Sequence, residues 1–314
     1  MDMKKFLTYE EQIELLKNKK LVIDNKEDSI KLLKRYSYFN LINGYKEPFK
    51  RKDGDYKKKT TFSDIFYLFS FDDEMRHILM KYIFIIELHI KSLLSYTFCE
   101  KFGEEQRAYC NANNYNYTNP KIVTEVNKLV QKLQEKIDDA ENINYMNHQL
   151  KSYGNIPLWV LVKSLTFGNV SKMYSLQLPE IQSKICHEFP IIRENDLEEM
   201  LDILTRYRNV CAHNERLYDF NYRKKRIKTN IMHKFFHLEK CRTKYTTLFD
   251  VIIILKFLLP QDKFSQMIKE INKNIETLFQ RTNQIQKSQL FSKMGFPVNW
   301  HEIENLNPET LKIT

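Results

Sequence analysis

Residues 63–99 decide the fold class, and they read SDIFYLFSFDDEMRHILMKYIFIIELHIKSLLSYTFC. Apolar side chains recur through this stretch at the spacing of a helix, and neither glycine nor proline interrupts it. This pattern predicts one long helix, either continuous or broken near Phe71. The stretch shows no convincing alternation of period two, so it gives no sign of a strand.

The segments on both sides also carry helical signals. Toward the N-terminus, Thr8 and Glu11 form a capping-box pattern, and Asn25 can cap a second short helix. Toward the C-terminus, the patterns predict helices over residues 123–137, from Pro157 to near Gly168, from Pro179, over 246–259 and over 263–279. Only 6 Gly and 8 Pro are present, too few turn formers for a many-stranded β fold. We therefore expect an all-α protein.

The order of these signals suggests three consecutive parts. Residues 1–60 hold the two short helices and a basic loop, and residues 61–222 hold the long helix and the helices after it. Residues 223–314 begin with a basic segment and continue as C-terminal helices. We expect the middle part to be a helical core, on which the terminal parts pack as extensions.

Charge and cysteine content limit the classes of partner and site. Lys and Arg outnumber Asp and Glu by 50 to 40, which favours a polyanionic partner. The five cysteines form no C-x-x-C pair, so neither a zinc site nor a disulfide framework is indicated, and we expect no metal and no cofactor. The N-terminus has no apolar stretch of signal-peptide length, and residues 248–259 are too short to span a bilayer. A cytoplasmic protein without a membrane partner is expected.

Residues 206–219 read RYRNVCAHNERLYD and hold the residues best suited to chemistry. Arg208 and His213 stand five positions apart, which on a regular helix separates their directions by about 140°. Asn209, His213 and Arg216 stand at i, i+4 and i+7, which predicts a polar stripe along one face of the helix. Because one helix splays Arg208 and His213, a second helix or a second copy of the chain must complete a site.

These residue types suit the cleavage of RNA through attack by its own 2′-hydroxyl group. A histidine, whose ordinary pKa is about 6.5, can accept and donate the proton, and an arginine can hold phosphate oxygens through two hydrogen bonds. Such chemistry depends on positioning and charge stabilisation, so it needs no metal. The spacing alone does not separate this role from that of a surface arginine beside a helix histidine, so the rest of the sequence has to decide.

The string RNVCAHNERLYD resembles the signature of the bacterial Abi-like, or abortive infection, proteins, whose core is a HEPN domain with an R-N-x-x-x-H motif. Further segments are similar to that family in the same order. They are TYEEQ at 8–12, GY at 44–45, FDDEMR at 71–76, IE at 86–87, IPLW at 156–159, FGNVS at 167–171 and MGFP at 294–297. The resemblance covers nearly the whole chain, and the block around Arg208 and His213 is its most specific part.

The resemblance implies an all-helical HEPN-type bundle, with N-terminal and C-terminal extensions, that forms a homodimer with one metal-independent ribonuclease site. It implies that Arg208 and His213 are the catalytic pair and that Asn209 is the polar residue beside them. It also implies a phage-defence toxin or the toxin of a toxin–antitoxin pair, which in some relatives a small RNA restrains. Arg206 and Arg216 flank the motif, so the choice of the arginine that holds the phosphate stays open.

Glu87 has both a functional and a structural interpretation. It lies among apolar residues of the long predicted helix. It could orient Arg208 or tune His213. Alternatively, it could form an ordinary i to i+4 pair with Lys91.

Two further patterns resemble binding sites. His233 and His237 have the spacing of metal ligands, with Cys241 one turn further on, but without a second ligand cluster a core or solvated pair is expected. The Asn/Tyr-rich residues 109–117 could stack unpaired bases. A loop packed by its own tyrosines is the expected alternative.

Two basic stretches could hold RNA phosphates, because cations beside a groove steer and bind a polyanion. Solvated loops are the structural alternative. The candidate residues are Lys57, Lys58 and Lys59 in the first stretch and Arg223, Lys224, Lys225, Arg226 and Lys228 in the second.

Three functions remain in view. The leading one is a metal-independent HEPN endoribonuclease, with RNA as its substrate and possible small-RNA partner. The first rival is a catalytically silent RNA-binding scaffold that uses the same basic groove. The second is a protein that only binds other proteins, which would leave the polar motif and the charge excess unexplained.

Overall fold

The structure is a computed structural model that describes residues 5–118, 120–189, 191–239 and 245–311. Helices form its regular secondary structure, and β pairing within these residues is confined to isolated bridges, such as the one between Lys50 and Tyr56. The all-α prediction is therefore confirmed. Within the described ranges, each helix is either too short or too polar to cross a membrane.

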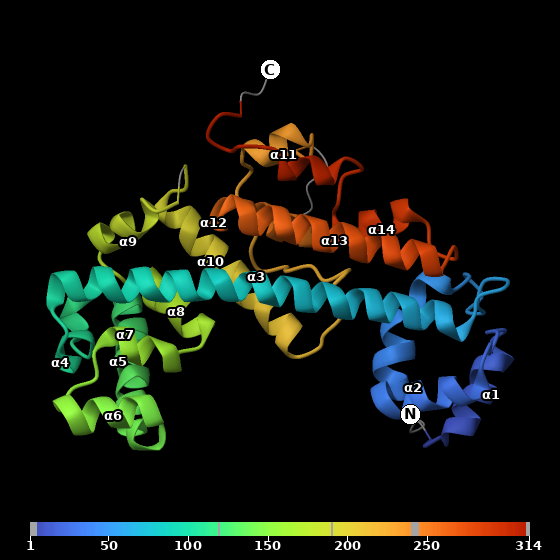
Figure 1. Cartoon of the computed structure of the whole chain (residues 1–314), viewed down its shortest axis with the longest axis horizontal. Helices are drawn as coiled ribbons and strands as arrows, with labels where there is room; N and C mark the ends of the chain where they lie inside the picture. The colour runs from blue at the N-terminus through green and yellow to red at the C-terminus, as the bar shows by residue number, and fades with distance from the viewer. Residues whose placement is uncertain (1–4, 119, 190, 240–244, 312–314) are drawn as a thin grey trace. The chain divides into compact units, whose positions relative to one another are not determined.

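The described residues divide into two compact units, each built from three separate segments of the sequence. Unit 1 takes residues from 1–79, 210–220 and 265–301, and unit 2 takes residues from 80–209, 221–264 and 302–314. The helices of unit 1 are α1 (Tyr9–Asn18), α2 (Lys26–Tyr38), the first part of α3 (Phe62–Phe102), most of α13 (Gln261–Arg281) and α14 (Lys287–Met294) (Figure 1). Those of unit 2 are the rest of α3, α4 (Gln106–Tyr109), α5 (Pro120–Asp138), α6 (Asn144–Tyr153), α7 (Leu158–Leu161), α8 (Phe167–Ser175), α9 (Pro179–Cys186), most of α10 (Glu194–Ala212), α11 (Ile231–Phe235) and α12 (Leu248–Leu258). Short π or 3₁₀ turns lie at Phe39–Asn43, Glu47–Phe49, Ala112–Asn114, Ala140–Asn142, Val162–Ser164 and Trp300–Glu304.

The long apolar stretch forms α3, a continuous helix of 41 residues, so the alternative of a break near Phe71 is wrong. Its start is fixed by a reciprocal cap. The backbone N–H of Asp64 donates to the Thr61 hydroxyl at 3.1 Å, and the backbone N–H of Thr61 donates to the Asp64 carboxylate at 2.7 Å. Such a cap satisfies backbone donors that a helix start leaves without partners.

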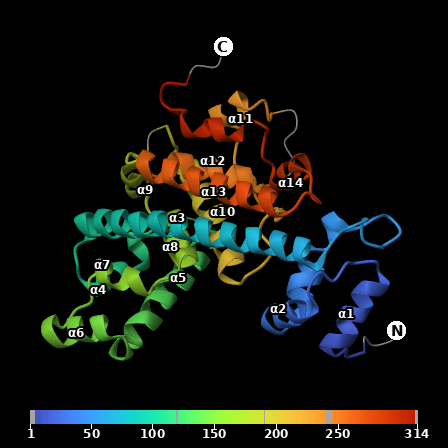
Figure 2. The same cartoon turned by 45° about the vertical axis from the view of Figure 1, so that its right-hand side comes forward.

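In unit 1, α13 runs beside the first part of α3 (Figures 1 and 2). The side-chain amide of Asn274 on α13 donates to the Phe71 carbonyl at 2.9 Å, and the Thr282 hydroxyl donates to Asp64 at 2.5 Å.

The predicted N-terminal caps of α1 and α2 are confirmed, since Thr8 and Asn25 accept backbone hydrogen bonds there.

In unit 2, the predicted helices at 123–137 and from Pro179 are confirmed as α5 and α9. The helix predicted from Pro157 to Gly168 is wrong at its end. Thr166 caps a new helix, α8, by accepting from the backbone N–H of Asn169 at 3.2 Å, so Gly168 lies in the first turn of α8. A Cβ atom at Gly168 would lie 3.4 Å from Thr205 on α10, so glycine allows the close approach of these two helices.

The Asn/Tyr-rich residues 109–117 bury two of their three tyrosines. Tyr109 and Tyr115 are buried, and their hydroxyl groups donate to the carbonyls of Ile156 and Tyr109, both at 2.7 Å. Tyr117 is exposed. The expectation of a loop packed by its own tyrosines is confirmed for Tyr115, whose hydroxyl group donates within the segment.

The apolar helix α12 lies in the core of unit 2, as its sequence predicts, and a buried polar group closes its start. Asp250 accepts from the backbone N–H and the hydroxyl of Thr247 at 2.7 and 2.8 Å, and its other oxygen lies 2.8 Å from Nε2 of the buried His233. His237 is exposed beyond the end of α11 at Phe235. His233 is therefore a core residue and His237 a solvated one.

These contacts account for His233 without a metal ion. The described residues contain no group of three or more His, Cys, Asp or Glu side chains that could hold one. Cys241 lies outside the described residues. Burial works to raise the pKa of Asp250, but the hydrogen bonds from His233 and Thr247 outweigh it and hold that pKa below 3.8.

We expect Asp250→Ala to lower the free energy of unfolding at pH 7 by about 3 kcal/mol, because the change removes the cap of α12 and takes the carboxylate away from Nε2 of the buried His233. A native pKa below the unfolded value stabilises the protein above pH 3.8, and this contribution is lost as the pH falls through the native value. Urea unfolding measures both effects. Asp262→Ala is the control, because Asp262 is an exposed acid in the first turn of α13. Equal losses in the two variants would contradict the prediction.

Candidate functional site

The helix α10 ends inside the motif that begins at Arg208. The backbone N–H of Glu215 donates to the Val210 carbonyl at 3.0 Å, and that of Asn214 donates to the Cys211 carbonyl at 3.2 Å. This pair of bonds is a Schellman closure. Asn214 takes the left-handed conformation that the closure requires, with φ of 53°, and asparagine tolerates it better than most residues. His213 is thus the C-cap residue of α10, and its side chain is exposed.

The predicted polar stripe is wrong beyond His213. Because α10 ends before that residue, Arg216 does not share a helix face with Asn209 and His213. Arg216 lies in the following turn, where its Nε donates to Asp219 at 2.6 Å and its Nη1 donates to the Gly44 carbonyl at 2.5 Å. Arg216 therefore anchors the segment after the motif to the N-terminal part of unit 1.

A buried carboxylate holds the same segment. Asp72 on α3 is 0% exposed. Its Oδ1 accepts from the backbone N–H of Tyr218 at 2.6 Å. Its Oδ2 accepts from the backbone N–H of Leu217 at 2.9 Å, the Tyr45 hydroxyl at 2.6 Å and Nη1 of Arg76 at 2.8 Å. Four donors thus replace the water that the buried charge loses.

The partners of Asp72 are themselves held in place. Arg76 is buried, its Nη2 donates to Asp73 at 2.7 Å, and its Nη1 lies 3.4 Å from the Glu215 carbonyl. The Tyr45 ring stacks on Tyr218, with centroids 6.1 Å apart. In the sequence, only the resemblance to the family singles these residues out. An Asp and an Arg at i and i+4 in an apolar helix are the signal that could have identified the pair.

In unit 2, Arg208 lies near the end of α10, with its guanidinium carbon 5.9 Å from the centre of the Phe84 ring on α3. Its Nε is buried and has no hydrogen-bond partner among the described residues. Glu87 lies one turn after Phe84 and is also buried. Its Oε1 accepts from Lys91 at 2.7 Å, and its Oε2 has no partner within the described ranges. The structure thus contains the i to i+4 pair, and a role of Glu87 toward Arg208 stays a prediction.

The remaining polar residues of the motif differ in accessibility. Arg206 and Asn209 are half-buried on α10. Burial, with a contribution from Asp72, raises the pKa of the Cys211 thiol to about 12. Cys211 therefore stays protonated at neutral pH and does not act as a thiolate nucleophile.

The second basic stretch lies against α10 in unit 2. Lys225 pairs with Asp202 at 3.3 Å, and Lys228 pairs with Asp196 at 3.2 Å. Both carboxylates belong to α10. The exposed cations of this stretch are Arg223, Lys224, Arg226 and Lys228. Their contact with RNA stays a prediction.

The first basic stretch forms a tight turn in unit 1. The backbone N–H of Arg51 donates to the Asp55 carbonyl at 2.8 Å, and Nζ of Lys57 donates to the Pro48 carbonyl at 2.6 Å. Lys58 and Lys59 are exposed. The turn is therefore ordered and carries cations at its surface.

Comparison with models of known protein families gives a match. A model of the Abi-like protein family matches residues 31–219, more than half of the chain. The matched range includes both the contacts of Asp72 and the motif from Arg208 to His213. Neither a curated protein nor a solved structure matches the sequence.

We expect Asp72→Asn to lower the free energy of unfolding by about 3 kcal/mol, because an amide offers one acceptor oxygen where the carboxylate offers two. Hydrogen exchange of the Leu217 and Tyr218 amides should accelerate in this variant. The control is Asp73→Asn, since Asp73 also contacts Arg76 but its side chain is 37% exposed. Unchanged protection of both amides in Asp72→Asn would contradict the anchoring role.

Proposed function

Because the chain belongs to the Abi-like protein family, we propose that it is a metal-independent HEPN endoribonuclease that acts as a toxin in phage defence or in a toxin–antitoxin pair. Family membership suggests abortive infection as the setting. The ribonuclease activity rests on the motif residues. A small RNA that restrains the toxin is part of the same proposal.

The observation that supports this proposal best is the state of the motif side chains. Arg208 and His213 make no side-chain hydrogen bond or ion pair in the described part of the chain, and His213 is exposed at a helix end. Arg76 and Arg216, in contrast, are engaged in structural contacts. We therefore assign the phosphate to Arg208 rather than to Arg216.

In the proposed reaction, the 2′-oxygen of one nucleotide attacks the adjacent phosphorus, and the bond from phosphorus to the 5′-oxygen breaks. The products are a 2′,3′-cyclic phosphate and a 5′-hydroxyl group. One His213 accepts the proton of the 2′-hydroxyl, and a second His213 donates a proton to the leaving 5′-oxygen. Arg208 holds the non-bridging oxygens, on which negative charge increases in the transition state.

The second His213 belongs to a second copy of the chain. A homodimer would bring two Arg208/His213 pairs to one groove, which one helix cannot do by itself. Apolar surface beside Arg208 supports this arrangement, since Phe84 and Leu88 on α3 are 47% and 69% exposed. Phe84 and Leu88 stand one turn apart on α3, so they can share a contact with a second chain.

We expect His213→Ala to reduce RNA cleavage by about 10²–10⁴-fold while RNA binding stays unchanged, because the change removes the group that transfers the proton. The assay uses purified protein and mixed RNA, with EDTA present throughout. The matched control is His187→Ala, since His187 is also an exposed histidine at a helix C-cap.

Cleavage by His213→Ala at the wild-type rate would refute the assignment. Loss of wild-type cleavage in EDTA, with rescue by magnesium, would refute metal independence. If the wild-type protein binds RNA but does not cleave it, the result would favour the catalytically silent RNA-binding scaffold. Absence of binding would favour a protein partner.

We expect Leu88→Glu to weaken the dimer and to reduce cleavage with it, because the change places a charge in the proposed contact. Four basic side chains repel one another without an anion, so the free dimer should weaken at low salt and tighten with RNA. Sedimentation of the free and RNA-bound protein measures both effects. Val298→Glu is the control, since Val298 is also an exposed apolar residue, at 90%, and is not part of the proposed contact at Phe84 and Leu88. A monomer that is fully active where no dimer exists would overturn the composite site.

A further inference from the structure

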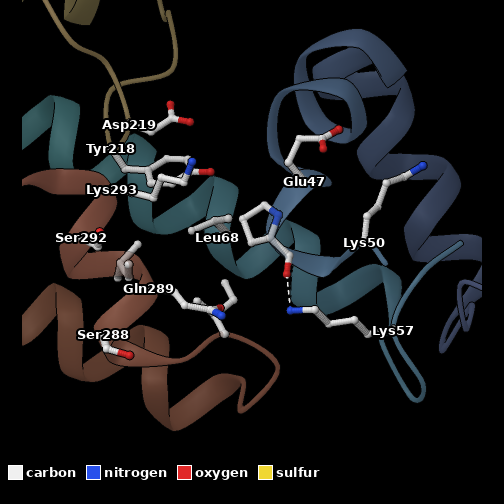
Figure 3. Close-up of a pocket in the computed structure, with 13 residues that line it drawn as sticks. Glu47, Lys50, Lys57, Leu68, Tyr218, Asp219, Ser288, Gln289, Ser292 and Lys293 are labelled. Atoms are coloured by element: carbon white, nitrogen blue, oxygen red, sulfur yellow. Dashed lines mark hydrogen bonds between the residues drawn. The ribbon is translucent and has the colours of Figure 1, made fainter. Parts of the chain in front are cut away.

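Unit 1 contains a pocket of about 700 Å³ that none of the residues discussed as catalytic occupies (Figure 3). Its walls come from α14, from the turn at residues 47–57 and from the segment that follows the motif. This volume is in the range of small-molecule sites. Figure 3 shows Gln289 of α14 and Lys57 of the turn pointing toward each other across the space.

The floor of the pocket is apolar. Leu68 of α3 is fully buried, and Ile285 and Leu290 are 4% and 2% exposed. Tyr218 adds an aromatic side chain to the wall. A flat apolar or aromatic group can lie against these residues with little loss of hydrogen bonding.

The rim of the pocket is cationic. Lys57 uses one of its three donors on the Pro48 carbonyl, and Lys293 makes no hydrogen bond or ion pair in the described part of the chain. Among the two acids of the lining, Asp219 is neutralised by Arg216 at 2.6 Å. Glu47 is exposed, and its carboxylate turns away from Gln289 in Figure 3. The ammonium groups therefore leave room for an anion.

We propose that this pocket binds one nucleotide, with its base on the apolar floor and its phosphate held by Lys57 and Lys293. The amide of Gln289, which points toward Lys57 in Figure 3, can donate a further hydrogen bond to the phosphate. The nucleotide is either a free mononucleotide or one unit of an RNA chain, because both present the same base and phosphate.

A ligand in the pocket would influence the motif through the segment that follows it, because that segment also lines the pocket. Tyr218 lines the pocket, and its backbone N–H is the donor to Asp72. Asp219 lines it too, and binds Arg216. The ligand would thus contact the segment whose fixed position sets the direction of the chain beyond His213.

The test measures binding to the full-length His213→Ala protein, so that cleavage of RNA does not interfere and a failure of the ribonuclease proposal does not affect the result. Calorimetry compares adenosine 5′-monophosphate, adenosine and a short RNA. The double variant Lys57→Ala/Lys293→Ala removes two of the three lysines that line the pocket, the two assigned to the phosphate. The control double variant Lys52→Ala/Lys287→Ala removes the same charge from the same turn and the same helix, but from exposed residues that do not line the pocket.

We expect the pocket variant to bind the monophosphate at least about tenfold more weakly than the control variant, and adenosine to bind more weakly than its monophosphate. If the tenfold loss appears with the monophosphate, the source is a free nucleotide, and if it appears with RNA alone, the source is an RNA chain. Equal affinity of the two double variants for both ligands, or no binding of either ligand, would overturn the proposal.

Discussion

The charge of Asp72 is buried where water cannot reach it, and unit 1 is arranged to supply donors to it. Three separate parts of the sequence provide them: Tyr45, Arg76 on the same helix, and the amides of Leu217 and Tyr218. An unmatched carboxylate in this place would cost several kcal/mol, so these parts must come together for the unit to be stable. The course of the chain after His213 follows from this requirement.

The elements that local signals control were predictable. Caps at Thr8 and Asn25, the uninterrupted apolar pattern of α3 and the buried helix α12 depend on residues within a few positions of one another. The boundary near Gly168 was not, because a glycine that normally indicates a helix end serves here to let α8 approach α10. Tertiary packing decided that position.

The candidate site likewise combines residues that the sequence identifies with contacts that local sequence does not predict. The types and order of the motif residues identify them, but the assumption of a helical period that continues through Asn214 is wrong, because the chain turns there with φ of 53°. That assumption misplaced Arg216. The role of Asp72 was out of reach because its amide partners lie 145 and 146 residues away, and no local pattern encodes such a pairing.

The segments of the two units alternate along the sequence, and this limits how early unit 1 can fold during synthesis. Unit 1 needs residues 265–301 beside residues 1–79, as the bond from Asn274 to the Phe71 carbonyl illustrates. A ribosome exposes the N-terminal segment long before the C-terminal one, so this unit cannot close until synthesis is nearly complete. A nascent chain that already carries the motif therefore has no finished unit 1, and a truncated translation product never acquires one.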